Sequence, residues 1–241
     1  MPGSDPPGED RLLGGRVRLA QPREGLRATT DPVLLAAFVP AQPGETVLEM
    51  GCGAGPAFLC LAARVPGIAV IAIERETELA ALAARNAAAN GVAADVRAAD
   101  LRAPGPLPRC DHAFANPPWW AGGTPPPSAR RAAATHEALP LAAWVAALAA
   151  PLRHLGTLSL VLPAARLADA AAALKAARCG ALTLLPLWPR AGLAAKRILL
   201  QARRGGRGPD RVLPGLVLHD AQGGYTAEAE AVLRGAAALR S

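Results

Sequence analysis

The chain has 241 residues, of which 51% are hydrophobic, enough for the core of one domain or of one domain with a small appendage. Its net charge of +7 is carried mainly by arginine. This charge would suit a polyanionic partner, but a proteome-wide bias toward arginine would also explain it. The sequence lacks a signal-peptide pattern, an uncharged apolar run of the roughly 20 residues that span a bilayer, and any C-x-x-C spacing. We therefore expect a cytoplasmic protein with reduced thiols rather than a secreted or membrane protein.

The N-terminal part divides into three segments. Residues 1–10 are acidic and rich in proline, which predicts a disordered tail before a single domain over residues 11–241. The next segment, "LLGGRVRLAQPREGLRA", has two short runs broken by glycine and proline, which predict a small hairpin. It is followed by "TTDPVLLAAFV", which predicts a helix capped by Thr30 or Asp31, with Pro32 at its first position.

From Thr46 onwards, strand patterns alternate with helix patterns. Strands are expected at "TVLEM", "IAVIAIE", "DVRAAD", "HAFAN" and "TLSLVL", and helices at "PAFLCLAARV", "RETELAALAARNAAAN" (ended by Gly91), "PLAAWVAALAAPLR" and "ARLADAAAALKAAR". Two late strands, "ALTLLPLW" and "KRILLQARR", predict an antiparallel pair at the sheet edge, and "TAEAEAVLRGAAAL" predicts a closing helix. This order predicts an α/β fold with a mostly parallel, seven-stranded sheet and helices on both faces.

A glycine-rich loop follows the first of these strands. The sequence "VLEMGCGAG" places Gly51, Gly53 and Gly55 between a strand and a helix. Glycine permits a tight turn and lets a ligand approach the backbone beside the free N–H groups of the helix start. Dinucleotide sites use the spacing G-x-G-x-x-G, which is absent here, and a merely structural turn does not need three glycines in five positions.

Three acidic residues lie near the ends of successive predicted strands. Glu49 precedes the glycine loop by two positions, where a carboxylate attracts an amine or a sulfonium and repels a pyrophosphate. Glu74 lies nineteen positions after Gly55, where an acid can accept both ribose hydroxyl hydrogens. Asp100 is placed to accept from an adenine amine. Since the carboxyl ends of parallel strands form the ligand edge of such a sheet, the three acids together predict an adenosine site.

The fourth strand pattern ends at "ANPPWW", which begins at Ala115. The lone pair of an adenine amine or an amide nitrogen is delocalised, so that nitrogen is a poor nucleophile. The side-chain oxygen of Asn116 and the backbone carbonyl of Pro117 can accept its two N–H groups in a loop that proline keeps rigid. Trp119 can stack on a planar substrate, which is worth about 1–3 kcal/mol per base. A rigid Asn-Pro turn with packed tryptophans is the structural alternative, and the role of Trp120 stays open.

These residues resemble those of the class I S-adenosylmethionine-dependent methyltransferases. The resemblance implies a Rossmann-like fold and S-adenosyl-L-methionine as cofactor, although many members carry aspartate where this chain has Glu49. The cofactor-binding residues that it implies are Thr30, Glu49, Gly51, Gly53, Gly55, Glu74, Asp100 and Asn116. "NPPW" resembles the [DNS]-P-P-[YFW] motif of members that methylate amino or amide nitrogens, which implies catalytic roles for Asn116, Pro117, Pro118 and Trp119.

From Leu12 to its end, the chain looks most like the bacterial valine-tRNA adenine-N6 methyltransferase family. The segments that carry this resemblance include "GLRATTDPVLLAAFVP", "KRILLQARRG" and "LVLHDAQGGYTAEAEAVLRG". They imply methyl transfer to adenine N6 near the anticodon of a tRNA, without a separate RNA-binding domain. A glutamine-amide N5-methyltransferase of a translation factor and a ribosomal guanine N2-methyltransferase share the motif and stay open. A catalytically idle adenosine-binding or RNA-binding module and a nicotinamide oxidoreductase explain the motif less well.

A tRNA partner would contact the surface of the catalytic domain itself. The cations that we expect to hold its phosphates are Arg130, Arg131, Lys196, Arg197, Arg203, Arg204 and Arg207. Scattered solvated arginines are the alternative. His136 has no partner that would make it a metal ligand, so we expect no metal and no membrane contact. We favour a monomer.

Overall fold

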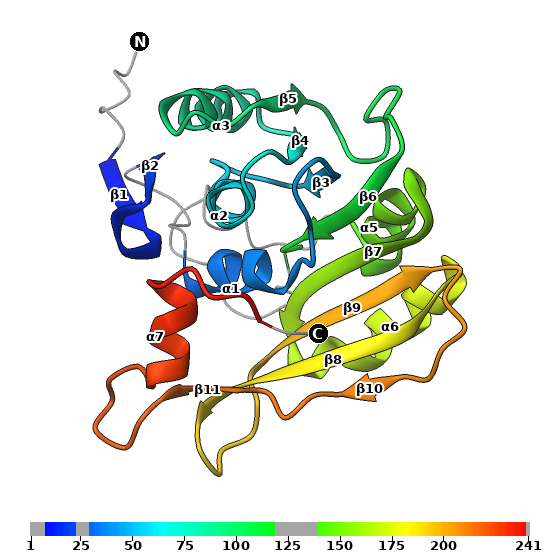
Figure 1. Ribbon diagram of the computed structural model, residues 1–241. Coiled ribbons are helices and arrows are strands. Elements are labelled where there is room, and N and C mark those ends of the chain that lie inside the picture. The colour runs from blue at the N-terminus through cyan, green and yellow to red at the C-terminus, as the bar shows by residue number, and fades with distance from the viewer. Residues whose placement is uncertain (1–7, 23–28, 119–138, 240–241) are drawn as a thin grey trace.

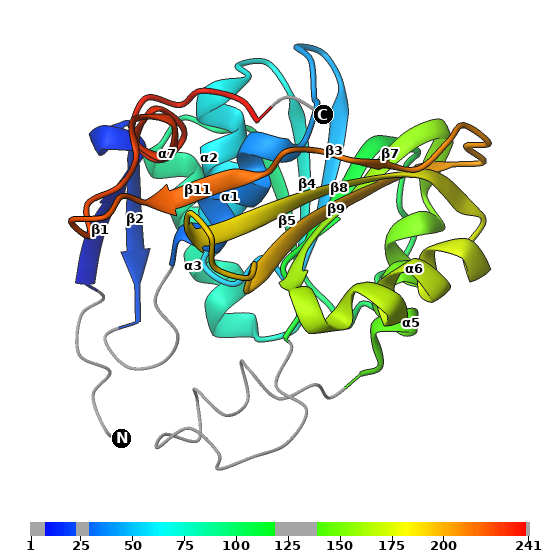
Figure 2. The same cartoon turned by 90° about the horizontal axis from the view of Figure 1, so that it is seen from below.

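The computed structural model describes residues 8–22, 29–118 and 139–239, and its central sheet has helices on both faces (Figures 1 and 2). The strands are β1 (Gly8–Leu12), β2 (Val17–Gln21), β3 (Thr46–Met50), β4 (Ala69–Glu74), β5 (Ala94–Ala98), β6 (Cys110–Ala115), β7 (Leu152–Pro163), β8 (Cys179–Arg190), β9 (Arg197–Arg204), β10 (Arg211–Val212) and β11 (Leu216–His219). The helices are α1 (Thr30–Phe38), α2 (Pro56–Arg64), α3 (Thr77–Ala89), α5 (Leu141–Ala149), α6 (Leu167–Ala176) and α7 (Ala227–Leu233), with 3-10 turns η1 (Leu13–Gly15) and η2 (Ala164–Arg166).

The main sheet has the strand order β10-β8-β9-β7-β6-β3-β4-β5, and β11 also pairs with β8. The seven expected strands are present, but the sheet has nine strands, because β10 and β11, which the sequence did not predict, also pair with β8. The pairs among β3 to β7 are parallel. The expected antiparallel pair of β8 and β9 is confirmed, but the antiparallel strand itself is not at the edge. β9 lies between β7 and β8 and is antiparallel to both. Its five consecutive buried residues, 198–202, explain this position, because a strand covered on both faces belongs inside the sheet.

Two apolar layers hold the sheet. On one face, α1, α2, α3 and α7 pack against the strands around the buried rings of Phe38, Phe58 and Phe114. On the other face, α5 and α6 bury Leu148 and Leu174. Both layers are continuous with strand residues of the centre of the sheet. The strand ends that carry the predicted site are therefore fixed by packing from both faces.

The N-terminal hairpin of β1 and β2 is docked on α3 by two asparagines. Asn86 accepts from the N–H of Ala20 at 3.0 Å and donates to its carbonyl at 2.9 Å. Asn90 makes the same pair of bonds with Arg18, at 2.9 and 2.7 Å. β1 begins at Gly8, so regular structure starts before the boundary at residue 11 that the sequence suggested.

The start of α1 differs from the expectation in its capping residue. Thr29, not Thr30 or Asp31, is the N-cap, and its hydroxyl accepts from the N–H of Asp31. Pro32 consequently occupies the third helical position rather than the first. The predicted end of α3 at Gly91 is confirmed, because Gly91 follows the C-cap of this helix with a φ of +66°.

Candidate functional site

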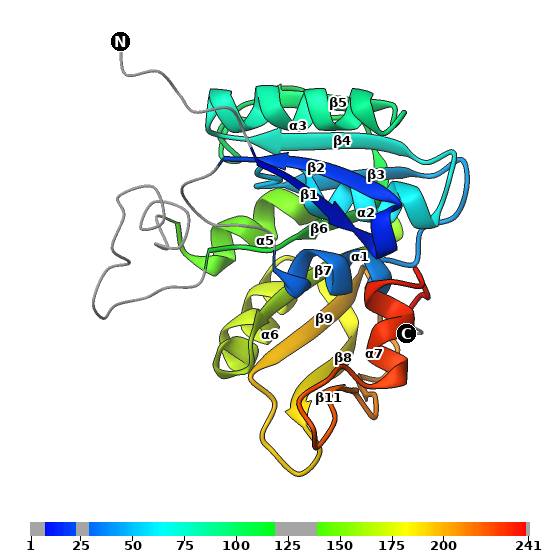
Figure 3. The same cartoon turned by 90° about the vertical axis from the view of Figure 1, so that its left-hand side faces the viewer.

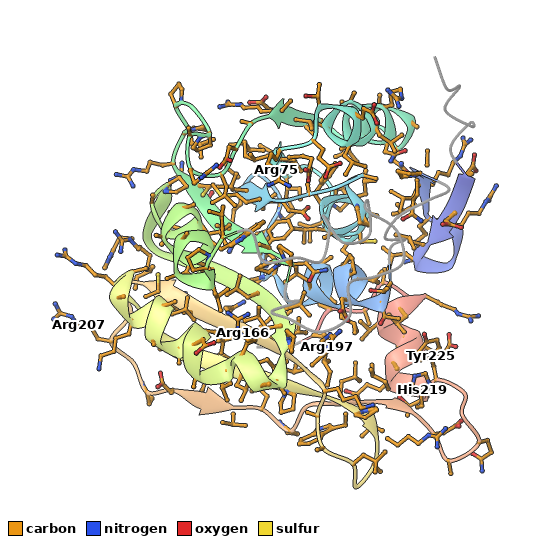
Figure 4. All side chains as sticks on the ribbon, turned by 180° about the vertical axis from the view of Figure 1, so that it is seen from behind. Arg75, Arg166, Arg197, Arg207, His219 and Tyr225 are labelled. Carbon is orange, nitrogen blue, oxygen red and sulfur yellow. The ribbon has the colours of Figure 1, made fainter. Side chains whose placement is uncertain are left out.

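The carboxyl ends of β3, β4, β6 and β7 meet at one edge of the sheet, since these strands are parallel. β9 runs the other way, so its first residue, Arg197, pairs with Pro163 at the end of β7. This arrangement gathers the glycine loop, the end of β4, the segment after β6 and the start of β9. Figure 4 views the molecule from behind Figure 1, with Arg75, Arg166 and Arg197 labelled.

The glycine loop connects β3 to α2, and each of its three glycines has a positive φ. A Cβ atom on Gly51 would lie 2.7 Å from the ring of Trp144, and one on Gly55 would lie 2.5 Å from the ring of Phe58. A Cβ on Gly53 would meet nothing within 4 Å. Packing therefore requires the two outer glycines, while the backbone of Gly53 faces open space that a ligand can approach.

Glu49 is buried beneath this loop. Its Oε2 accepts a hydrogen bond from the N–H of Phe58 in the first turn of α2 at 2.9 Å, and its Oε1 bonds no residue within the described ranges. Burial raises the pKa of the Glu49 carboxyl well above its ordinary range; the Phe58 N–H opposes this shift and the charge of Glu74 adds to it. A ligand cation near Oε1 would stabilise the ionised carboxylate.

Glu74, at the end of β4, links its strand to the glycine loop. Its Oε2 accepts from the N–H of Gly53 at 2.8 Å, and its Oε1 accepts from the N–H of Glu76 at 2.9 Å. Both oxygens are thus held by backbone donors, and the residue is buried. Each carboxylate oxygen retains a second acceptor position for a ligand hydroxyl.

Asp100 follows β5 and is engaged by a neighbouring cation. Arg102 donates to it from Nε at 3.0 Å and from Nη2 at 2.7 Å. These side-chain bonds, with the backbone N–H of Arg102 and the charge of Arg75, lower the pKa of Asp100 to about 2. The sequence did not predict this ion pair, so an adenine amine at Asp100 would share the carboxylate with Arg102.

The segment after β6 contains the predicted nitrogen site. Asn116 is partly exposed, and its carboxamide makes no hydrogen bond to a residue in the described part of the chain. Pro117 behind it is buried, and Pro118 is partly buried. An amide that bonds none of the described residues, on a segment anchored by a buried proline, can present its acceptor oxygen to a substrate. Trp119 and Trp120 lie outside the described residues.

The predicted basic cluster is wrong as a single surface. Arg197 lies at the carboxyl edge, where its Nε contacts Oδ2 of Asp31 at 3.1 Å, and Lys196 is exposed beside it. Arg203 pairs with Thr157 of β7, and Arg204 pairs with Cys179, the first residue of β8, towards the opposite edge. Arg207 is exposed beyond them, apart from Arg197 in Figure 4. The length of β9 therefore separates Lys196 and Arg197 from the other three cations. Arg130, Arg131 and His136 lie outside the described residues.

Thr30 lies in the wall of an open cavity shared with the N-terminal hairpin and Tyr225. The four cysteines are free and buried, as expected of structural thiols. No cluster of metal-binding side chains occurs among the described residues. Within the same residues, no helix is long and apolar enough to span a membrane.

Two residues that support the site escaped the sequence analysis. Asn86 donates to the carbonyl of Ala54 at 2.9 Å and so joins the glycine loop to α3 and the N-terminal hairpin. Trp144 in α5 packs beneath Gly51, and its buried indole N–H bonds no group of the described residues. Asparagine inside an alanine-rich helix was a usable signal for Asn86, because a polar side chain there needs a partner. Trp144 offered no comparable signal.

Two proteins of known function have sequences similar to this chain. The chain is similar to the tRNA1(Val) (adenine(37)-N6)-methyltransferase of Yersinia enterocolitica, with 39% identity over 71 residues, 29% of this chain and 28% of that protein. It is also similar to the release factor glutamine methyltransferase of Cereibacter sphaeroides, with 36% identity over 114 residues, 46% of this chain and 40% of that protein. These matches span less than half of either relative.

Solved structures extend the likeness over the fold. A predicted O-methyltransferase of Agrobacterium tumefaciens matches with a TM-score of 0.71 and 25% identity, covering 87% of this chain and 98% of that one. A T. thermophilus 16S rRNA N2 methyltransferase, in complex with AdoMet and guanosine, matches with a TM-score of 0.60 and 22% identity over 82% and 50% of the two chains. The family model described as "Methyltransferase small domain" matches residues 29–162. The chain belongs to this methyltransferase family and has the class I methyltransferase fold.

Proposed function

We propose that the chain is an S-adenosylmethionine-dependent N-methyltransferase that methylates N6 of an adenine in the anticodon-loop region of a tRNA. One observation carries the nitrogen assignment: the carboxamide of Asn116, which bonds no residue of the described ranges, lies at the end of β6, beside the strand that leads into the glycine loop. The family and the Yersinia relative support the reaction and the substrate, respectively. We place the enzyme in tRNA modification in the cytoplasm, as a monomer.

The residues of the carboxyl edge fit the proposed cofactor. Open space above Gly53 admits a ligand to the backbone. Oε1 of Glu49, which bonds no described residue, can meet the amine end, and buried Glu74 can accept from ribose hydroxyls. Asp100 would accept from the adenine amine, and Thr30 and Asn116 complete the proposed set. When bound, S-adenosylmethionine supplies an electrophilic methyl group from its sulfonium.

Asn116 and Pro117 act on the substrate nitrogen. Their oxygens accept its two N–H groups, which holds the lone pair out of the plane of the ring and directs it toward the methyl group. The acceptors are in place before the reaction because Pro117 is buried and proline restricts the backbone. We assign base stacking to Trp119 and phosphate contacts to Arg130, Arg131, Lys196 and Arg197. No strong base is needed, since the nitrogen loses its proton after it becomes cationic.

A glutamine amide is the second candidate acceptor. It presents the same delocalised –NH₂ group to Asn116, and the similarity to the release factor glutamine methyltransferase extends over more of this chain than the tRNA relative does. The net charge of +7 favours a nucleic-acid substrate over a protein loop. A ribosomal guanine N2 amine would meet the same acceptors.

The test is to incubate the enzyme with radiolabelled S-adenosylmethionine and either total tRNA, ribosomal RNA or a translation-factor fraction. We expect label in tRNA, recovered as N6-methyladenosine after digestion to nucleosides. Label in protein glutamine would replace the tRNA assignment by the amide one, and N2-methylguanosine in ribosomal RNA would replace it by the guanine one. Label in none of the fractions would refute the proposed reaction.

A further inference from the structure

An open cavity of about 570 Å³ lies beside the predicted catalytic edge, between the N-terminal hairpin, the start of α1 and α7. Figure 3 faces this side of the molecule, where the hairpin lies above α7 with α1 next to both. Its lining residues are Arg11, Leu12, Leu13, Gly14, Thr29, Thr30, Val33, Tyr225, Leu233 and Arg234. The volume is in the range of small-ligand sites, and the lining has two cations and no acid.

Arg11 is a cation with no counter-charge among the described residues. It is exposed on β1, and its guanidinium makes no ion pair or hydrogen bond with a residue in the described ranges. It lies directly opposite Arg18 in the hairpin register. Arg18 itself forms an ion pair with the nearby acid Glu9, with Nη2 and Oε2 3.3 Å apart. Like charges in opposite positions destabilise a hairpin, so the charge of Arg11 does not stabilise the pairing of β1 with β2. An anion in the cavity would provide the missing counter-charge.

The second cation and an aromatic ring come from the C-terminal part of the chain. Arg234, at the end of α7, contacts Glu230 through Nε at 3.0 Å and is 68% exposed, which leaves its terminal nitrogens accessible. Tyr225 is the only tyrosine of the chain, and one face of its ring stacks on His219 with centroids 4.8 Å apart. A planar ring supported on one face by another ring is a platform on which a base can stack.

The cavity adjoins the reaction site through α1. Thr29 and Thr30 lie in its wall, and the next residue, Asp31, forms the ion pair with Arg197 at the carboxyl edge. A polymer held at Asn116 can therefore continue along the start of α1 into the cavity. A single nucleotide bound there would place a phosphate near the arginines and a base near Tyr225.

We propose that this cavity binds a nucleotide of the substrate RNA next to the one that is methylated, with Arg11 and Arg234 on its phosphate and Tyr225 on its base. The inference rests on the proposed tRNA substrate. It assigns tRNA affinity to the hairpin of β1 and β2 and to the segment around α7, neither of which contains a predicted catalytic residue. The site acts on binding of the RNA and not on the methyl transfer itself.

The experiment compares Arg11→Gln, Tyr225→Leu and Tyr225→Phe with Arg207→Gln as a matched control at the opposite edge of the sheet. Filter binding to a tRNA transcript over a salt series, methyl-transfer kinetics and thermal unfolding are measured for each. We expect Arg11→Gln to raise the tRNA Kd about five- to tenfold and to reduce the salt slope by about one unit. Tyr225→Leu should raise Kd at least fivefold, while Tyr225→Phe and Arg207→Gln stay near wild type.

The kinetic constants separate this site from a structural role. We expect KM for tRNA to rise in Arg11→Gln and Tyr225→Leu, with kcat and the affinity for S-adenosylmethionine within about twofold of wild type. If the wild type methylates tRNA but folded Arg11→Gln protein binds it with wild-type affinity and salt dependence, the cavity assignment is wrong and the function stands. If the wild type methylates no RNA, the proposed substrate and this site fail together.

Discussion

The backbone N–H of Gly53 donates to Oε2 of Glu74 at 2.8 Å, so the glycine loop and the end of β4 form one unit. The second oxygen of Glu74 accepts from Glu76, which fixes the carboxylate plane before any ligand binds. Such prior orientation lowers the cost of ordering the site when a ligand is bound.

The change Glu74→Gln tests this unit. Both oxygens accept from backbone N–H groups, so either orientation of the amide would point its –NH₂ at another donor. We expect S-adenosylmethionine to bind about 10- to 100-fold more weakly, because a hydrogen bond to a charged group contributes about 1.5–3 kcal/mol. Isothermal titration calorimetry measures the change, and Glu228→Gln, an exposed carboxylate in α7, is the control. Unchanged affinity would show that Glu74 only holds the loop.

Two glycine substitutions should separate packing from ligand access. Gly51→Ala puts a methyl group 2.7 Å from the ring of Trp144, whereas Gly53→Ala puts one into open space. Both also force a non-glycine residue into a left-handed conformation, at a cost of about 1–2 kcal/mol. Gly51→Ala should therefore lower the melting temperature more than Gly53→Ala does. Gly53→Ala should lose affinity for S-adenosylmethionine while it stays folded.

The clash at Gly51 can be tested further by a double mutant. Combining Gly51→Ala with Trp144→Ala removes the ring that the new methyl group meets, so the two destabilisations should not add. Additive losses in chemical denaturation would contradict the contact as the cause.

The buried carboxyl of Glu49 predicts a pH dependence. Burial raises its pKa, so its protonated form favours folding: stability is greatest below the unfolded pKa of about 4.3 and falls as pH rises through the folded pKa. Glu49→Gln keeps an acceptor for the Phe58 N–H and should stabilise the ligand-free protein near pH 7. Each kcal/mol corresponds to about 2–4 °C in melting temperature for a chain of this size.

The same ionisation should govern cofactor affinity. A cationic ligand needs Glu49 charged, so its affinity should fall as pH is lowered through the raised pKa of this carboxyl. Asp100, whose pKa is about 2, stays ionised over that range and should not contribute. Calorimetric titrations between pH 5 and 8 should lose their pH dependence in Glu49→Gln and keep it in Asp100→Asn. The reverse pattern would contradict the assignment.

Arg64 anchors the C-terminal segment on α2. Its guanidinium donates to the carbonyls of Val232, at 2.8 Å, and of Ala237, and no carboxylate of the described chain pairs with it. Arg64→Met leaves two carbonyls without donors, and we expect a loss of about 2 kcal/mol or more in the free energy of unfolding. Arg85→Met, an exposed change on α3, should have little effect. Urea denaturation and limited proteolysis near α7 measure both.

Much of the fold follows from local pattern. The apolar runs of β3, β4 and β6 end at a glycine or a polar residue, so both the strands and the residues at their carboxyl ends were predictable. Glu74 and Asn116 were found for this reason. The insertion of β9 between β7 and β8 was not, because strand order depends on pairing between distant segments.

The errors at the site have the same origin. Arg197 and Arg204 are close in sequence, but seven steps along a strand separate them by about 23 Å. Asn86 and Trp144 act through contacts with Ala54 and Gly51, which only the folded arrangement brings near. The ion pair of Asp100 with Arg102 was within reach of the sequence, since the two residues are two positions apart.

The central claim is that Asn116 holds the nitrogen that receives the methyl group. Single-turnover methyl transfer to tRNA by Asn116→Ala, with S-adenosylmethionine affinity measured on the same protein, tests it most directly. We predict a rate at least about 100-fold below wild type, while the cofactor Kd changes by less than about tenfold. A rate within a few-fold of wild type at saturating cofactor and tRNA would contradict the claim.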